Sequence, residues 1–251
     1  MTRPGTSTRK SRAPSPAARL PGTTPPGTTP LRQTGASRRE RRRLDSEARI
    51  LDAAEQVFAE TGFSGATTAD IADKAGLPKA NVHYYFGTKE RLYRQVLERI
   101  LEAWLASGDS IRPEADPAAA FADYIAAKME ASHRQPFASK VFANEILHGA
   151  PQLSDYLAGQ VRHWVDGKAT VIDQWVARGA MQPVDVPHLF FVIWSSTQTY
   201  ADFECQIRAV LKRDRLKPVD FVAGTALITR MVLGACGIVD KSPRQTRSRA
   251  R

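Results

Sequence analysis

The chain has 251 residues, 42% of them hydrophobic, and its 36 Lys and Arg against 26 Asp and Glu give a formal charge of +10. This length and composition allow one large or two modest folded domains and exclude a wholly disordered chain, and no apolar run approaches the roughly 18 residues of a membrane span. The excess charge lies in the tails, because residues 1–43 carry +10, residues 241–251 carry +5 and residues 44–240 sum to −5. A basic globule that coats nucleic acid is therefore disfavoured, whereas a specific site assisted by a basic arm is allowed.

Residues 1–43 predict a disordered segment. They contain seven prolines, twelve Ser or Thr and no aromatic residue, so they cannot bury enough apolar surface to offset the entropy lost on ordering. The segment ends in a dense basic cluster at residues 38–43, and residues 241–251 form a second basic tail.

Between these tails the apolar residues recur at helical spacing, which predicts an all-α fold. Thr67 with Asp70 three residues later is typical of a capping box, and Gly62 and Gly76 are suited to end helices. The expected helices are about 46–62, 67–75, 78–86, 88–106, 117–133, 136–148, 152–178, 186–213 and 218–236. The predicted regions are a disordered tail at 1–43, a small helical unit at 46–106, a larger helical unit at 107–240 and a basic tail at 241–251.

Residues 67–86 carry the motif from which function is predicted: two short helices joined by a tight glycine turn, the geometry of a helix-turn-helix. In that geometry the first helix crosses the DNA backbone and the N-terminal part of the second enters the major groove. The candidates for contacts with base edges are Lys79, Asn81 and His83. The candidates for contacts with phosphates are Tyr84, Tyr85, Thr67, Thr68 and Lys89. The alternative, a plain helical bundle with core aromatic residues, would bury two tyrosine hydroxyls in a very small domain.

The stretch 50–105, with AAEQVFAETGFSGATTADIADKAGLPKANVHYYFGTKERLYRQVL at its centre, strongly resembles the DNA-binding domain of the TetR family of bacterial transcriptional regulators. The resemblance implies a helical homodimer whose two recognition helices read a short palindromic DNA operator. It also implies that a small-molecule effector controls the affinity for the operator, so we expect a repressor. The positions that match the DNA-contacting sites of the family are Thr67, Thr68, Lys79, Ala80, Asn81, His83, Tyr84, Tyr85 and Lys89.

The larger unit carries a narrower resemblance, to the RutR-like branch of pyrimidine-utilisation regulators. This resemblance implies a pocket for a pyrimidine base such as uracil or thymine. Trp104 and Trp194 offer aromatic faces to a flat ring, and Gln198, one helical turn from Trp194, offers an amide, with the hydroxyl of Thr197 beside it. The alternatives are ordinary core tryptophans with an interhelical Gln198, or an effector of unrelated chemistry. The segments that carry the resemblance are 100–105, 141–151 and 191–203.

Other classes of function are disfavoured by the residues present. The five histidines are scattered, and neither a Cys/His cluster nor a phosphate loop or nucleophile elbow occurs, so we expect no catalytic residue, no metal and no cofactor. A helical dimer that senses a metabolite without binding DNA conflicts with the intact 67–89 motif. A membrane-surface role for the basic tails lacks an amphipathic aromatic face.

Cysteine usage and the start of the chain bear on the compartment. The two cysteines lie 31 residues apart, which is not a disulfide framework, and no apolar stretch follows the charged N-terminus. We therefore expect a cytoplasmic protein associated with the bacterial nucleoid.

Overall fold

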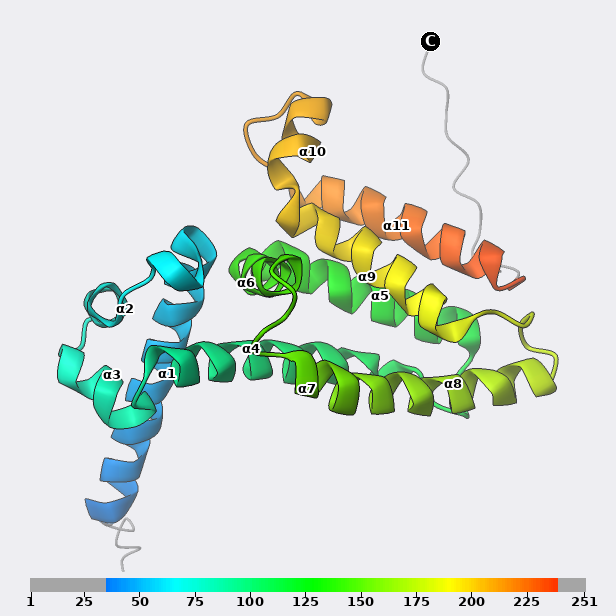
Figure 1. The fold of residues 1–251 in the computed structure, drawn as a ribbon. Coiled ribbons are helices and arrows are strands. Elements are labelled where there is room, and N and C mark those ends of the chain that lie inside the picture. The colour runs from blue at the N-terminus through cyan, green and yellow to red at the C-terminus, as the bar shows by residue number, and fades with distance from the viewer. Residues whose placement is uncertain (1–34, 239–251) are drawn as a thin grey trace, which may run out of the picture.

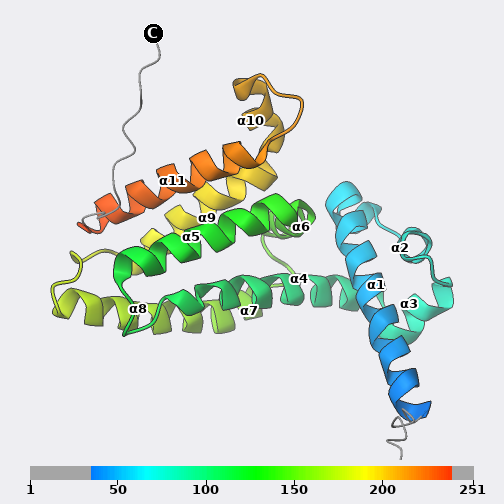
Figure 2. The same ribbon diagram turned by 180° about the vertical axis from the view of Figure 1, so that it is seen from behind.

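The computed structural model describes residues 35–238, and within that range the chain is α-helical without a strand, so the all-α prediction is confirmed (Figure 1). The first helices are α1 (Gly35–Gly65), α2 (Thr68–Ala75), α3 (Lys79–Phe86) and α4 (Lys89–Ala106). The later elements are η1 (Ser107–Ser110), α5 (Pro117–Arg134), α6 (Pro136–Leu147), α7 (Ser154–Tyr156), the π-helical η2 (Leu157–Val161), α8 (Arg162–Ala177), α9 (Val186–Asp202), α10 (Glu204–Leu211) and α11 (Pro218–Ala235). Helices α1–α3 gather at one end, and α4 runs from them along the later helices (Figures 1 and 2).

The start of α2 has the predicted capping box. The hydroxyl of Thr67 accepts the Asp70 backbone N–H at 3.1 Å, and the Asp70 carboxylate accepts the Thr67 backbone N–H at 3.3 Å. Gly76 ends the helix with a φ of 64°, a left-handed conformation that glycine adopts without steric cost. The short sequence pattern is therefore sufficient to set both ends of α2.

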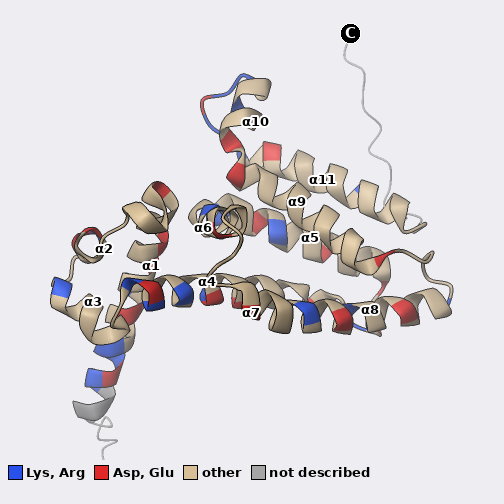
Figure 3. Cartoon of the chain, viewed as in Figure 1, with Lys and Arg blue, Asp and Glu red and all other residues tan. Residues whose placement is uncertain are grey.

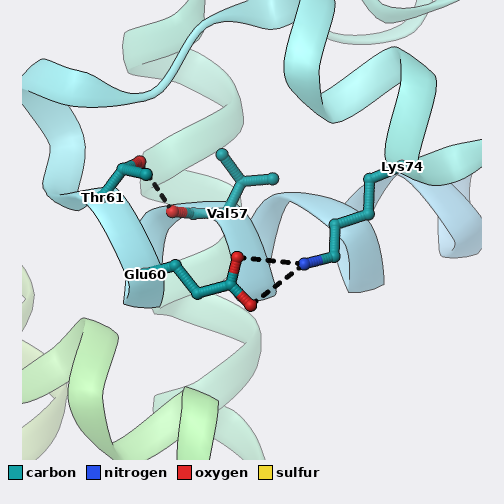
Figure 4. Close-up of polar contacts among 4 residues, drawn as sticks. All are labelled: Val57, Glu60, Thr61 and Lys74. Carbon is teal, nitrogen blue, oxygen red and sulfur yellow. Dashed lines mark hydrogen bonds and ion pairs between the residues drawn. The ribbon is translucent and has the colours of Figure 1, made fainter.

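Side chains of α1 hold α2 in place (Figure 4). The Lys74 ammonium lies 3.1 and 3.2 Å from the two carboxylate oxygens of Glu60, and the Thr61 hydroxyl donates to the Val57 carbonyl at 2.8 Å. Nearer the start of α1, the Arg49 guanidinium donates to the Ala75 carbonyl at 2.7 Å, which satisfies a carbonyl at the end of α2. The Lys74–Glu60 and Arg49–Ala75 contacts join α2 to α1, whereas the Thr61–Val57 bond lies within α1.

Helix α1 starts at Gly35, so the prediction of disorder is wrong for residues 35–43 and the first helix starts earlier than residue 46. Arg43 lies 3.5 Å from the carboxylate of Glu40 and 3.3 Å from that of Glu47, one helical turn away on either side. Such pairs, together with the high helix propensity of Arg and Glu, offset the repulsion among clustered arginines. The predictions for residues 1–34 and for the tail 241–251 lie outside the described residues.

The larger unit follows the predicted helix boundaries at its prolines, since α5, α6 and α11 each have a proline as their first residue. Its core is rich in aromatic rings. Phe121 packs edge-on against Trp175 with ring centroids 5.6 Å apart, and Phe190 packs against Trp164 at 4.9 Å. Trp175 is fully buried.

Two long helices differ from their predicted extents. The expected helix 186–213 breaks at Phe203, where φ is −113° and ψ is 30°, so that α9 and α10 are separate helices. No glycine or proline marks that break, and periodicity alone therefore did not show it. The expected helix 152–178 begins at Ser154 and contains the π-helical turn η2 before α8.

The two units share a hydrophobic core at their junction. Ala138 and Val141 of α6 are buried in the same cluster as the core of the α1–α4 unit. Glu145 of α6 is also buried there, and its carboxylate accepts the Gln152 backbone N–H at 2.6 Å. Burial raises the pKa of Tyr93 on α4, and the nearby Glu145 carboxylate raises it further. Helix α6 is thus packed directly onto the helix-turn-helix unit.

Candidate DNA-reading surface and effector cavity

Helix α3 is anchored by one face and exposed on the other. Val82 and Phe86, four residues apart, are buried against the rest of the unit. Tyr84 is 79% exposed, and the Tyr85 ring packs edge-on against it at 5.0 Å between centroids. Of the predicted contacts on α3, those with exposed side chains are Lys79, Ala80, His83 and Tyr84, and those with half-buried side chains are Asn81 and Tyr85. A donor- and acceptor-bearing surface of the kind that reads a major groove lies on one face of this helix.

The orientation of His83 is set by its own helix end. Its Nδ1 donates to the Gly87 carbonyl at 3.1 Å, which leaves Nε2 as an acceptor on the exposed side. The start of α3 has no side-chain cap, because Pro78 occupies that position. The Asn81 amide donates to the Pro78 carbonyl at 2.9 Å, so the amides of Lys79 and Ala80 are the ones that remain able to meet a phosphate.

Thr67 and Thr68 precede or begin α2. The hydroxyl of Thr67 is exposed, and it donates to the Asp70 carboxylate at 2.7 Å as well as accepting from the backbone, so its proton is already used within the protein. Thr68 is half-buried. A phosphate near this helix end could accept hydrogen bonds from backbone N–H groups. It could not accept one from the Thr67 hydroxyl, which already donates to Asp70.

The structure gives Lys89 a structural partner. Its ammonium donates to the carbonyls of Phe63 at 2.8 Å and Ala66 at 3.0 Å, and it also lies 4.5 Å from the centroid of the Phe63 ring. Helix α1 is kinked at Gly62, where φ is 71° and ψ is 173°. Two of the three N–H groups of Lys89 therefore satisfy carbonyls that follow this kink. Lys89 joins α4 to α1, and at most one N–H remains for a phosphate.

Basic residues lie on the part of α1 that extends past α3. This N-terminal part of α1 projects on the side away from α2 and contains Lys or Arg residues (Figure 3). The exposed arginines there are Arg38, Arg39, Arg41, Arg42 and Arg43. The residues from 67 to 91 sum to only +1, so most of the positive charge near α3 comes from α1.

A small cavity of about 60 Å³ lies where α4, α5, α6 and α9 meet. Three of the four predicted ligand residues, Trp104, Trp194 and Gln198, line it, and the structure therefore brings together side chains that are far apart in the sequence. The remaining lining residues are Leu101, Leu105, Tyr124, Lys128, Phe142, Leu157 and Val161. Apolar walls with a few convergent polar groups are typical of a site for a small molecule.

The polar groups of the cavity differ in the hydrogen bonds that they already make within the protein. The Trp194 indole N–H donates to the Tyr124 hydroxyl at 2.7 Å, so Trp194 offers the cavity a ring face and Tyr124 retains its O–H as a donor. Burial raises the pKa of Tyr124 far above its usual value, which keeps that proton in place. The Gln198 amide has no hydrogen bond with any residue in the described range 35–238 and remains available to a ligand.

Thr197 does not line the cavity, contrary to the arrangement expected from its place beside Gln198. It is fully buried, and its hydroxyl donates within α9 to the carbonyls of Ile193 at 2.8 Å and Trp194 at 3.1 Å. Neighbouring residues on a helix point about 100° apart, so only one of the adjacent pair faces the cavity.

Lys128 is a cavity residue that the sequence analysis did not identify. It is only 3% exposed, and its ammonium lies 3.9 Å from the centroid of a Trp104 ring. A sequence signal existed, since Lys128 lies seven residues after Phe121 and four after Tyr124, on the buried stripe of α5. A lysine on an apolar stripe is unusual enough to mark a site.

A second and larger cleft adjoins the cavity at Gln198. It measures about 430 Å³ and includes Ala59 of α1, so it opens at the seam between the two units. Its other lining residues are Lys140, Phe142, Ala143, Asn144, Ile146, Leu147, Asp202 and Phe203. Burial raises the pKa of the Asp202 carboxyl, and the positive charges of Lys140 and Lys128 partly offset this rise.

Two family models match adjoining parts of the chain. Residues 50–96 match the family described as bacterial regulatory proteins, tetR family, and residues 97–239 match the C-terminal region of YcdC-like proteins. The HTH-type transcriptional regulator RutR of Escherichia coli K12 is 45% identical over 161 residues, which cover 64% of this chain and 76% of that protein. The HTH-type transcriptional repressor NicS of Pseudomonas putida is 34% identical over 100 residues, 39% of this chain and 47% of that protein.

Solved structures have the same fold. PfmR, a TetR family transcriptional regulator from Thermus thermophilus, matches with a TM-score of 0.57 at 18% identity over 77% of this chain and 96% of that one. A TetR family regulator from Marinobacter aquaeolei matches with a TM-score of 0.60 at 15% identity over 76% and 97% of the two chains. With the family matches to both units and the identity to RutR, the chain belongs to the TetR family of DNA-binding transcriptional regulators and is RutR-like.

Proposed function

We propose that this protein is a repressor that binds a palindromic operator as a homodimer and releases it when a small flat effector, a pyrimidine base such as uracil or thymine, enters the cavity at Trp104. The observation that carries the proposal is the course of α4. This single helix starts beside α3 and ends with Trp104 in the cavity wall. A ligand there acts on the same rigid element that supports the DNA-reading surface. The protein would act in the cytoplasm, on the DNA of the nucleoid.

The roles proposed on DNA follow from the chemistry of the side chains that are exposed or half-buried on α3. Lys79, Asn81 and His83 read base edges, while Tyr84 and Tyr85 contact phosphates or sugar. Ala80 is an exposed small side chain suited to contact a thymine methyl group. The dimer would place its two recognition helices about 34–36 Å apart, one turn of DNA.

Effector and operator would oppose each other through two packed routes. Helix α4 carries the first route. Helix α6 carries the second, since Phe142 of α6 lines the cavity while Ala138 and Val141 of α6 are buried in the core of the DNA-binding unit. Movement of α4 and α6 around a ligand would change the distance between the two recognition helices of the dimer. The coupling expected for such a system is about 1–3 kcal/mol, and it must be reciprocal.

Calorimetry tests this coupling. Uracil and thymine are titrated into the protein alone and into the protein saturated with operator DNA, which is first identified by selection from genomic fragments. We expect about 5–150-fold weaker effector binding in the presence of operator. Equal affinities in the two states would refute the coupling, and DNA binding no stronger than to random fragments would refute the operator.

The proposed dimer interface is the outer face of α9 and α11. Exposed apolar side chains on it are Phe191, Val192, Val222, Leu227 and Met231, each at least 50% exposed. Helix α11 is long and apolar enough to cross a membrane, with a mean hydropathy of 1.3, yet only 28% of it is buried. A second copy covering both helices would remove this apolar surface from water.

Replacing Met231 by glutamate should convert the dimer to a monomer. The side chain is 58% exposed in one chain, so the fold tolerates the change, but in the dimer each copy would bury an unpaired charge at a cost of about 3–5 kcal/mol. Sedimentation velocity measures the outcome. Leu147→Glu on α6, 80% exposed and away from this face, is the matched control and should remain dimeric. A dimeric Met231→Glu variant would place the interface elsewhere.

A further inference from the structure

The effector cavity contains a charged side chain that the protein itself does not pair. The Lys128 ammonium makes no hydrogen bond within residues 35–238, and its close partner is the face of Trp104 at 3.9 Å. A buried ammonium is costly unless it is paired, and one aromatic face offsets only part of that cost. The lysine lines the cavity, so a ligand there can supply the missing partner.

The other residues that line the cavity include no acidic side chain that could pair with Lys128. Tyr124, on the same helix, is a neutral donor, and the amide of Gln198 on α9 is neutral as well. Asp202 on α9 is the acid that acts on Lys128, but it lines the adjoining cleft rather than the cavity and its own pKa is raised by burial. Burial lowers the pKa of Lys128 to about 7, and Asp202 opposes that shift only in part.

We propose that the effector is an acid: a small, flat, single-ring molecule that binds with an anionic oxygen, a carboxylate or an ionised ring oxygen, on the ammonium of Lys128. Its ring lies against Trp194, and its polar edge meets the Tyr124 hydroxyl and the Gln198 amide. The small cavity restricts the effector to one ring. This inference rests on the proposed function in using the same cavity of the same regulator, and it replaces the uncharged pyrimidine base named there by an anionic single-ring ligand.

The test compares each acid with its isosteric, uncharged amide. Uracil-5-carboxylate, uracil-6-carboxylate and benzoate are titrated by calorimetry against the corresponding carboxamides, with uracil as the uncharged parent ring. For at least one pair we expect the acid to bind at least about tenfold more tightly, since a bond to a charged group is worth more than a neutral one. Titrations in two buffers of different ionisation enthalpy should show proton uptake at pH 7.5, because the anion favours the protonated amine.

Lys128→Met should remove both the preference for the acid and the proton uptake. The change keeps an unbranched apolar chain over Trp104, and removing a buried unpaired charge does not cost stability in general. Lys140→Met is the matched control, since Lys140 is half-buried and lines only the adjoining cleft. It should keep the preference of the unchanged protein. Thermal melting and operator binding confirm that both variants are folded.

The outcomes separate this inference from the proposed function. If no acid is preferred over its amide, or if Lys128→Met keeps the preference, the anionic class is overturned. If uracil bound the unchanged protein and Lys128→Met equally and released operator, the proposal of an acidic effector would be wrong. The proposed regulatory function would then still hold. Acid binding that needs Lys128 but leaves operator affinity unchanged would support the site and refute its role as the effector cavity.

Discussion

Replacing Asn81 and His83 together by alanine is expected to abolish the preference for operator over random DNA. His83 is exposed and Asn81 is half-buried, each side chain offers hydrogen-bonding groups, and one good contact to a base edge is worth about 1–3 kcal/mol of discrimination. Neither side chain belongs to the buried anchor formed by Val82 and Phe86, so the helix should keep its place. Fluorescence anisotropy with operator and with scrambled DNA of equal length measures the ratio of affinities.

The matched control changes charge without changing the reading surface. Arg39→Ala with Arg42→Ala on the exposed start of α1 should weaken binding to both DNAs alike and reduce the salt slope by about 1 for each arginine that contacts a phosphate. If the α3 variant kept the affinity ratio and the α1 variant lost it, the bases would be read by α1 and not by α3.

Replacing Gln198 by leucine should weaken the response to the effector while leaving operator binding intact. The amide has no hydrogen bond within the described part of the chain, so its removal frees no protein group, while the similar volume of leucine preserves the cavity wall. A ligand edge left without its partner costs about 1–3 kcal/mol, or about 5–150-fold in effector affinity. Calorimetry measures this loss, and operator affinity in the absence of effector should stay unchanged.

Gln174→Leu is the control for that change, because Gln174 is an exposed glutamine of α8 far from the cavity lining. It should bind effector and release operator as the unchanged protein does. Unaltered effector binding in Gln198→Leu would mean that the amide serves packing alone and that the ligand lies elsewhere.

Local features of this fold were predictable because they depend on neighbouring residues. The capping box of Thr67 and Asp70, the stop at Gly76 and the prolines that begin α5, α6 and α11 each act within one or two turns. The start of α1 and the break at Phe203 were not predicted. A run of arginines resembles a disordered tail until its pairing with Glu40 and Glu47 is counted, and the break lacks a helix-breaking residue.

The features of this protein divide into those that the sequence alone predicts and those that depend on tertiary packing. The sequence alone determined an acidic body with basic tails, an all-α fold and a helix-turn-helix whose side chains suit DNA, because composition and short-range spacing carry that information. Only the tertiary structure decided that Lys89 bonds to α1, that Thr197 faces away from the cavity, and that Lys128 enters it. Those outcomes depend on which faces of α4, α5 and α9 meet. The spacing of neighbouring residues can mark Lys128 as buried, but it does not show which side chains of distant helices surround it.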